Sequence, residues 1–141
     1  MLKGISPVIS PELLRVLAEM GHGDEIVFGD ANFPHESMGQ ITVRADGHLI
    51  TELLEAILPL FPLDTFVEAP VALMEVVPGD AAGKPSVWDE YKAIAEKYAP
   101  GTKFEYIERF AYYERAKKAY AIVATGERER YANLLLKKGV I

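Results

Sequence analysis

Apolar residues recur at helical spacing near the start of the chain, directly after a helix-start signal. The stripe comprises Leu13, Leu14, Leu17 and Met20. Ser10 is a favoured N-cap residue and Pro11 suits the first helical position, so the pattern predicts a helix that begins after Ser10. Gly21 is expected to end this helix as a left-handed C-cap. His22 then lies in a loop that leads into a predicted strand over residues 25–28.

Later segments alternate between helical and strand periodicity. Helices are predicted over residues 49–58, 86–98 and 111–119, and strands over residues 71–77, 104–107, 120–124 and 134–137. Residues 86–89, Ser-Val-Trp-Asp, have the pattern of a capping box. Because strands alternate with helices, we expect an α/β fold, a single layered domain with a central mixed, largely parallel sheet flanked by helices. The length of 141 residues fits one domain over residues 1–141.

Charge and composition narrow the range of partners. Lys and Arg total 15 against 21 Asp and Glu, and this net charge of -6 argues against a nucleic-acid partner. Hydrophobic residues make up 50% of the chain, so we expect other copies in a homo-oligomer to cover part of the surface. Residues 1–7 lack the apolar stretch of a signal peptide, and Pro59 and Pro62 interrupt the longest apolar run, residues 56–63. We therefore expect a cytoplasmic protein with no membrane partner.

Motifs that the chain lacks exclude several chemistries. There is no cysteine, which excludes disulfides, thiol nucleophiles and Cys-based metal sites. There is also no P-loop, no HExxH and no GxSxG motif. Gly21-His22-Gly23 begins like a dinucleotide-binding loop, but no third glycine follows in register and a strand comes next instead of a helix. We therefore expect neither a metal nor a nucleotide cofactor.

Polar segments that flank the predicted strands carry the candidate chemistry. Residues 126–133 join two strands through a glycine turn, a charged tip and a Tyr-Ala-Asn corner, which can aim backbone and amide groups at a polyhydroxy ligand. Asp30 follows the first strand, where α/β sheets place ligand groups, although an Asx turn leading to Pro34 explains it equally well. His22 can carry a proton near neutral pH or simply bond a backbone carbonyl. Together these segments suggest a small acid/base site for a sugar.

Several longer motifs occur together in this sequence. They are Ile5-Ser6-Pro7, residues 21–25, residues 30–34, residues 109–116 and residues 137–140. In this combination the chain resembles the fucose mutarotase / D-ribose pyranase family over nearly its whole length. The D-ribose pyranases share the Gly-His, Asp-Ala and Tyr-Ala-Asn signatures but not residues 109–116, so the L-fucose branch is the closer match. Residues 78–103 carry little of the likeness.

The resemblance implies an activity and a set of residue roles. The implied enzyme is an L-fucose mutarotase, an isomerase that interconverts the α and β anomers of a free monosaccharide by acid/base-assisted ring opening without a cofactor. The resemblance assigns proton transfer to His22, and it assigns sugar binding to Asp30, Arg109, Tyr131, Ala132 and Asn133. Tyr120 is a further candidate neighbour of the sugar. The resemblance also implies a ring-shaped homo-oligomer, decameric in bacterial relatives, with sites at subunit boundaries.

Three alternatives stay open at this point. A D-ribose pyranase would use the same residues on a different sugar, a sugar-binding module would not catalyse, and His22, Asp30 and His35 could form a metal site. His35 and His48 are otherwise interpreted as solvated loop residues. An aromatic cluster beside Arg109 is expected at a subunit contact. This cluster comprises Phe110, Tyr112 and Tyr113.

Overall fold

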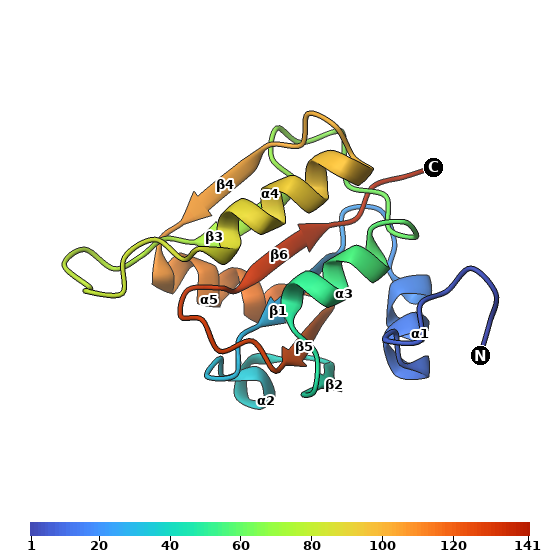
Figure 1. Cartoon of the computed structure of the whole chain (residues 1–141), viewed down its shortest axis with the longest axis horizontal. Helices are drawn as coiled ribbons and strands as arrows, with labels where there is room; N and C mark the ends of the chain where they lie inside the picture. Colours follow the sequence, from blue (N-terminus) through green and yellow to red (C-terminus); the bar gives the residue numbers. More distant parts are fainter.

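The computed structural model of the chain describes residues 1–141 (Figure 1). The helices are α1 (Pro11–Glu19), α2 (His35–Met38), α3 (Ile50–Ile57), α4 (Val87–Tyr98) and α5 (Arg109–Lys118). The strands are β1 (Glu25–Gly29), β2 (Thr42–Ala45), β3 (Val71–Met74), β4 (Phe104–Ile107), β5 (Ala121–Thr125) and β6 (Leu134–Lys137). The predicted α/β class, with strands and helices in alternation, is confirmed. None of the helices is long and apolar enough to cross a lipid bilayer.

The strands form one six-stranded sheet in the order β2-β5-β1-β6-β3-β4. Parallel pairing joins β2 to β5, β5 to β1 and β3 to β4. Strand β6 runs antiparallel to both of its neighbours, β1 and β3, so it alone opposes the common direction. The sheet is therefore mixed and largely parallel, as predicted. The carboxyl ends of the parallel strands and the start of β6 lie at the same end of the sheet. An α/β fold places ligands at this end.

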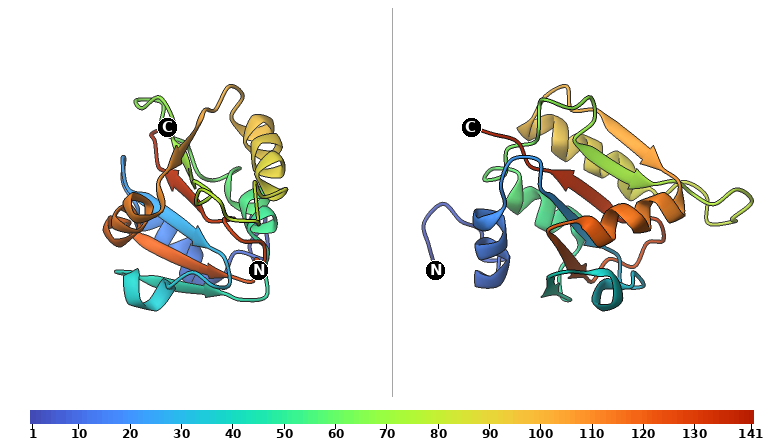
Figure 2. Two further views of the ribbon diagram at one scale, coloured as in Figure 1. Left: turned by 90° about the vertical axis from the view of Figure 1, so that its left-hand side faces the viewer. Right: turned by 180° about the vertical axis from the view of Figure 1, so that it is seen from behind.

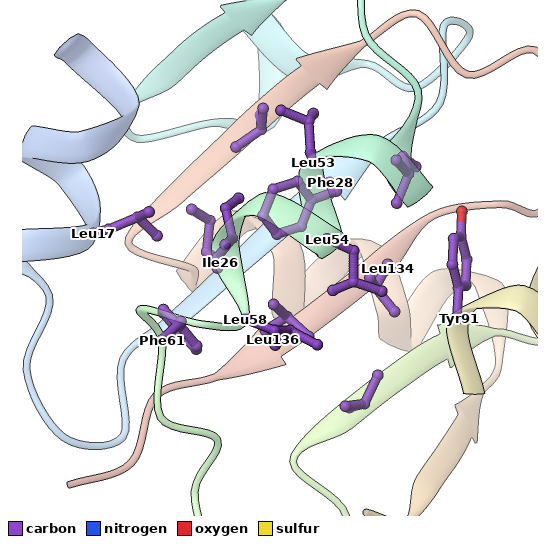
Figure 3. Close-up of a cluster of buried hydrophobic side chains, with 14 of the residues drawn as sticks. Leu17, Ile26, Phe28, Leu53, Leu54, Leu58, Phe61, Tyr91, Leu134 and Leu136 are labelled. Atoms are coloured by element: carbon purple, nitrogen blue, oxygen red, sulfur yellow. The ribbon is translucent and has the colours of Figure 1, made fainter. Parts of the chain in front are cut away.

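Helices cover both faces of the sheet, because successive strand residues point to opposite faces. Helices α1, α3 and α4 pack on one face and α5 packs on the other, which the turned views make visible (Figure 2). Ile26 and Phe28 of β1 belong to the larger core cluster, whereas Val27 between them belongs to the smaller cluster beneath α5. Leu53 and Leu54 of α3 belong to the same larger cluster as Phe28, and all three are almost completely buried (Figure 3).

Two predicted helix details are wrong. Gly21 is not a left-handed cap and has no positive φ. Helix α1 ends at Glu19, its C-cap residue Met20 has extended backbone, and the Asp24 carboxylate accepts the Gly21 N–H at 2.7 Å. Ser86 does not form a capping box, since its side chain makes no cap hydrogen bond to α4. Both its backbone N–H and its hydroxyl donate instead to the carboxylate of Glu129, a charged acceptor that outcompetes the helix end.

The predictions also missed two short elements and overextended one. Strand β2 has only four residues at the edge of the sheet and α2 has a single turn, so neither is long enough to show a period. Strand β3 ends at Met74 and not at residue 77, although the next N–H, that of Glu75, still donates to Ile107 of β4. The chain then leaves the sheet in a loop that protrudes from the body of the molecule (Figure 1).

Candidate functional site

A pocket of about 370 Å³ opens at the edge where the parallel strands end and β6 begins. The polar part of its lining comprises Asp30, Asn32, Asp80, Arg109, Arg130, Tyr131 and Asn133. Asp30 follows β1, Arg109 follows β4 and Asn133 precedes β6, so the sheet itself brings these three together. Four predicted site residues, Asp30, Arg109, Tyr131 and Asn133, therefore meet in one pocket.

Asp30 and Asn133 hold each other in place. The Asn133 side-chain oxygen accepts the Asp30 backbone N–H at 2.8 Å, which leaves the Asn133 amide nitrogen as the free donor. One carboxylate oxygen of Asp30 accepts the Asn32 N–H at 2.9 Å in an Asx turn. Asp30 is only 6% exposed, and this burial raises the pKa of its carboxyl group above the ordinary range. The pocket thus contains a rigidly held carboxyl group with an altered proton affinity.

The Tyr-Ala-Asn corner has an unusual backbone. Tyr131 is the one non-glycine residue with positive φ, at 61°. The carbonyl oxygens of Tyr131 and Ala132 are fixed by α4, since they accept the Trp88 indole N–H at 2.9 Å and the Tyr91 hydroxyl at 2.7 Å. The backbone N–H groups of Tyr131, Ala132 and Asn133 have no hydrogen-bond partner in the chain. The corner therefore keeps its acceptors engaged and its donors available for a ligand.

Asp80 reaches this corner from the loop between β3 and α4. Its carboxylate accepts the Tyr131 hydroxyl at 2.6 Å and the Arg130 guanidinium at 2.5 Å. The hydrogen bond from Tyr131, followed by those from Ala82 and Arg130, holds the pKa of Asp80 well below its usual range. The same contact with Asp80 raises the pKa of the Tyr131 phenol. At neutral pH the pair is a carboxylate and a neutral phenol.

Arg109 is the first residue of α5, and its guanidinium makes no ion pair in the chain. The preceding Glu108 caps the helix by accepting the N–H groups of Phe110 and Ala111, both at 3.0 Å. The guanidinium carbon lies 5.3 Å from the Phe110 ring centre and 5.6 Å from that of Tyr113. Contact with Tyr113 steadies Arg109 and raises the pKa of its guanidinium, and because this group makes no ion pair it has further N–H donors for hydroxyl groups.

One wall of the pocket is apolar. It is made by Phe33, Met74 and Tyr113. The Phe33 and Tyr113 rings meet edge to face, with centres 5.7 Å apart, and Phe33 and Met74 belong to the core cluster beneath α5. The pocket therefore offers hydrogen-bonding groups on one side and a hydrocarbon surface on the other, which suits a ligand with both characters.

His22 and Tyr120 lie outside this pocket. His22 precedes β1 and Asp30 follows it, so the strand holds them about 13 Å or more apart at about 3.3 Å per residue. The His22 ring bonds Asp64 through Nε2 at 3.1 Å, packs against Phe66 and remains 44% exposed. Tyr120 precedes β5 at the same end as His22 and donates its hydroxyl to Glu19. A single chain does not bring these two residues to the pocket.

The other two histidines lie outside the pocket, and one of them differs from its predicted environment. His35 was expected to be solvated but is 8% exposed in α2, because its ring packs against Gly29 and Phe33. Its Nε2 has no hydrogen-bond partner. His48 bonds Glu52 one helical turn away, at 3.1 Å. No group of three or more His, Asp or Glu side chains is arranged to hold a metal ion.

The sequence model of the RbsD / FucU transport protein family matches residues 3–141. The chain belongs to this family. A fucose mutarotase from Streptococcus pneumoniae, solved in complex with L-fucose, is 50% identical with a TM-score of 0.94, and the match covers 99% of each chain. FucU from Bifidobacterium longum is 51% identical with the same TM-score, again over 99% of each chain. The resemblance inferred from the sequence is thus confirmed.

A relative of lower sequence identity has a similar fold. Bacillus subtilis RbsD, solved in complex with D-ribose, is 23% identical with a TM-score of 0.71, and the match covers 100% of this chain and 99% of RbsD. At this identity the likeness shows the fold alone. The fold is therefore shared by structures that contain different sugars.

Sequence reasoning missed several pocket residues of this family member. The sequence predicts no site role for Asp80, Arg130, Phe33 or Met74, all of which line the pocket. One available signal was the position of Asp80 between Gly79 and Gly83, in a loop that follows the carboxyl end of a strand. The Asp80 to Tyr131 contact joins residues 51 positions apart, so no local pattern predicts it.

Proposed function

We propose that this chain is an L-fucose mutarotase. The observation that carries the proposal is its likeness to the Streptococcus pneumoniae fucose mutarotase, at 50% identity over 99% of both chains. The pocket supports it with groups suited to a small sugar. Asn133, Arg109 and the free N–H groups of residues 131–133 are donors, and Asp30 is an acceptor. The Phe33 and Met74 wall suits the methyl group of a 6-deoxy sugar.

The reaction requires two proton transfers and no redox step. A base removes the proton of the anomeric hydroxyl while an acid protonates the ring oxygen, so the bond between the anomeric carbon and the ring oxygen breaks and an open-chain aldehyde forms. Rotation about the bond from the aldehyde carbon to its neighbour, followed by the reverse proton transfers, closes the ring as the other anomer. Positioned acid/base groups accelerate such a step by about 10²- to 10⁴-fold. Because sugar rings already open in water without an enzyme, this acceleration is enough for a useful catalyst.

For His22 to take part, it must come from a second copy of the chain. His22 is partly exposed and stands beside an apolar groove that includes Leu60, Val140 and Ile141. Burial of this groove by another subunit would bring His22 to that subunit's pocket and cover apolar surface at the same time. We therefore propose a homo-oligomer, a decameric ring as the family resemblance implies, in which His22 of one subunit carries the proton at the pocket of the next.

Saturation-transfer NMR on free sugars tests the function directly. Irradiating one anomeric proton of L-fucose and following the other anomer measures the exchange rate, with heat-denatured protein as the control. We expect faster exchange of L-fucose than of D-ribose. Exchange of D-ribose alone would indicate a pyranase. Line broadening of L-fucose without faster exchange would indicate a sugar-binding module and would contradict the enzymatic function.

A further inference from the structure

The loop between β3 and α4 contributes one side chain to the sugar pocket at the point where Tyr131 lines it. This side chain is Asp80. One carboxylate oxygen accepts the Tyr131 hydroxyl at 2.6 Å, and the other accepts Arg130 at 2.5 Å and the Ala82 N–H at 2.9 Å. Loop residues Gly79 and Gly83 have positive φ, which turns the loop back toward the corner.

The direction of the first hydrogen bond determines what Tyr131 can offer a sugar. A phenol has one proton and two lone pairs. Since the proton of Tyr131 is donated to Asp80, the phenol oxygen can act only as an acceptor toward the pocket. Its neighbours in the pocket, the Asn133 amide nitrogen and the Arg109 guanidinium, are donors. An acceptor among donors matches a sugar hydroxyl, which both donates and accepts.

We propose that Asp80 is a positioning residue for sugar binding, which fixes the Tyr131 hydroxyl as a hydrogen-bond acceptor for one hydroxyl of the substrate. This inference rests on the proposed sugar-binding function of the pocket. It assigns a role to a loop that the family motifs do not include.

Charges around the pair support this role. The contacts of Asp80 lower its pKa, so it remains an acceptor throughout the neutral range, and its contact raises the pKa of Tyr131, so the phenol keeps the proton that it donates. Arg130 balances the negative charge of Asp80 through their ion pair. The arrangement therefore does not switch between donor and acceptor near neutral pH.

The corner does not depend on Asp80 for its shape. Trp88 and Tyr91 of α4 hold the carbonyl oxygens of Tyr131 and Ala132, and Ser86 is bonded to Glu129. Removing the Asp80 carboxylate should therefore release the phenol proton while the backbone stays in place. A positioning role can thus be separated from a structural one.

A double-mutant cycle tests the inference, with anomer exchange measured across L-fucose concentrations to separate kcat from KM. Loss of one hydrogen bond corresponds to about a 5- to 10-fold rise in KM, and we expect this from both Asp80→Ala and Tyr131→Phe with kcat little changed. The double variant should be no worse than the poorer single variant, because both changes remove the same interaction. Lys84→Ala is the control, since Lys84 lies in the same loop, outside the pocket, and pairs with Asp89.

Tyrosine-selective ¹³C NMR supplies a second readout that a purely structural role would not change. In Asp80→Ala, the pKa of the Tyr131 phenol should fall back toward its ordinary value, while thermal unfolding stays close to that of Lys84→Ala. Effects on KM that multiply in the double variant would overturn the inference, because Asp80 would then act on the sugar independently. An Asp80→Ala variant with the KM of wild type would overturn it as well. If the wild type fails to accelerate exchange, the proposed function fails, and L-fucose titration of the same variants still decides the role of Asp80.

Discussion

Asn133 accepts the backbone N–H of Asp30 through its side-chain oxygen at 2.8 Å, across 103 positions of sequence. The bond fixes which end of the amide faces the pocket. Asn133→Asp keeps the acceptor but replaces the free N–H₂ donor with an oxygen, beside a second carboxylate. We expect a fold that is retained and an L-fucose KM that rises about tenfold or more, because a donor is lost and two like charges meet. Anomer exchange and thermal unfolding of the same sample check both parts. A KM equal to that of wild type would show that the amide does not contact the sugar.

Because Asp30 is buried, replacing it with a neutral residue should stabilise the protein and reduce its activity. Its pKa is raised in the folded state, so its contribution to stability is present below the ordinary pKa of an aspartate and is lost as pH rises through the folded value. Asp30→Asn removes this penalty and keeps an oxygen for the Asn32 N–H. Relative to wild type, the variant should therefore become more stable as pH rises above the ordinary pKa of an aspartate, while L-fucose exchange falls. Urea unfolding at a series of pH values measures the difference. A stability difference that does not change with pH would mean that Asp30 is not the group that titrates.

Subunit mixing tests whether His22 acts in the pocket of another copy. His22→Ala and Arg109→Ala should each abolish accelerated exchange when alone. Refolded together in equal amounts, they should recover about a quarter of wild-type activity, because random pairing of mutant subunits regenerates intact sites at that frequency. Mixing His22→Ala with Asp30→Asn serves as a second combination across the same boundary. Failure of both mixtures to recover activity, with mixed oligomers formed, would contradict the shared site.

The exposed aromatic beside the pocket predicts where subunits meet. Tyr112, expected at a subunit contact, is fully buried in the core beneath α5, whereas Phe110 is 66% exposed. We expect Phe110→Asp to dissociate the assembly and to reduce exchange with it, because a charge replaces apolar contact area. Lys118→Ala, on the exposed side of the same helix, should change neither property. Light scattering and exchange on one sample decide the matter, and a dissociated variant with wild-type turnover would show that each chain has a complete site.

The apolar wall predicts a preference that one matched pair of sugars can measure. L-Galactose differs from L-fucose only by a hydroxyl on the methyl carbon. If Met74 and Phe33 receive that methyl group, wild type should favour L-fucose by about 10- to 100-fold in kcat/KM. Met74→Gln, of similar length but polar, should narrow the ratio, whereas Met38→Gln, which packs on the same cluster outside the pocket, should not. An unchanged ratio in Met74→Gln would place the methyl group elsewhere.

Local signals in the sequence predicted most of the fold. The Ser10 cap and the Pro11 start define α1, and the Ser10 side chain does accept the Leu13 N–H, because these effects act within one helical turn. The antiparallel direction of β6 could not be predicted in this way, since a run of three leucines predicts a buried strand without indicating its direction. Tyr131 has a left-handed backbone conformation, which is rare for a bulky residue, so the sequence does not predict it.

The sequence predicted residues of the candidate site only within the segments that carry the family motifs. Asp30, Arg109, Tyr131 and Asn133 were named from the sequence and lie in one pocket, although their roles remain predictions. Asp80 was not found, because its importance comes from a contact across the fold. The separation of His22 from the pocket was also unforeseen, since it depends on which end of β1 each residue occupies.

The position of β6 has a consequence for synthesis of the protein on the ribosome. Strands β2, β5 and β1 form one group and β3 and β4 form another, and β6 is the only strand that pairs with both. Strand β6 is the last of the six strands in the sequence, so it leaves the exit tunnel after the other five. Until then, the two groups expose open strand edges that can pair with other chains. The nascent chain therefore cannot join the two groups into one sheet until β6 has emerged.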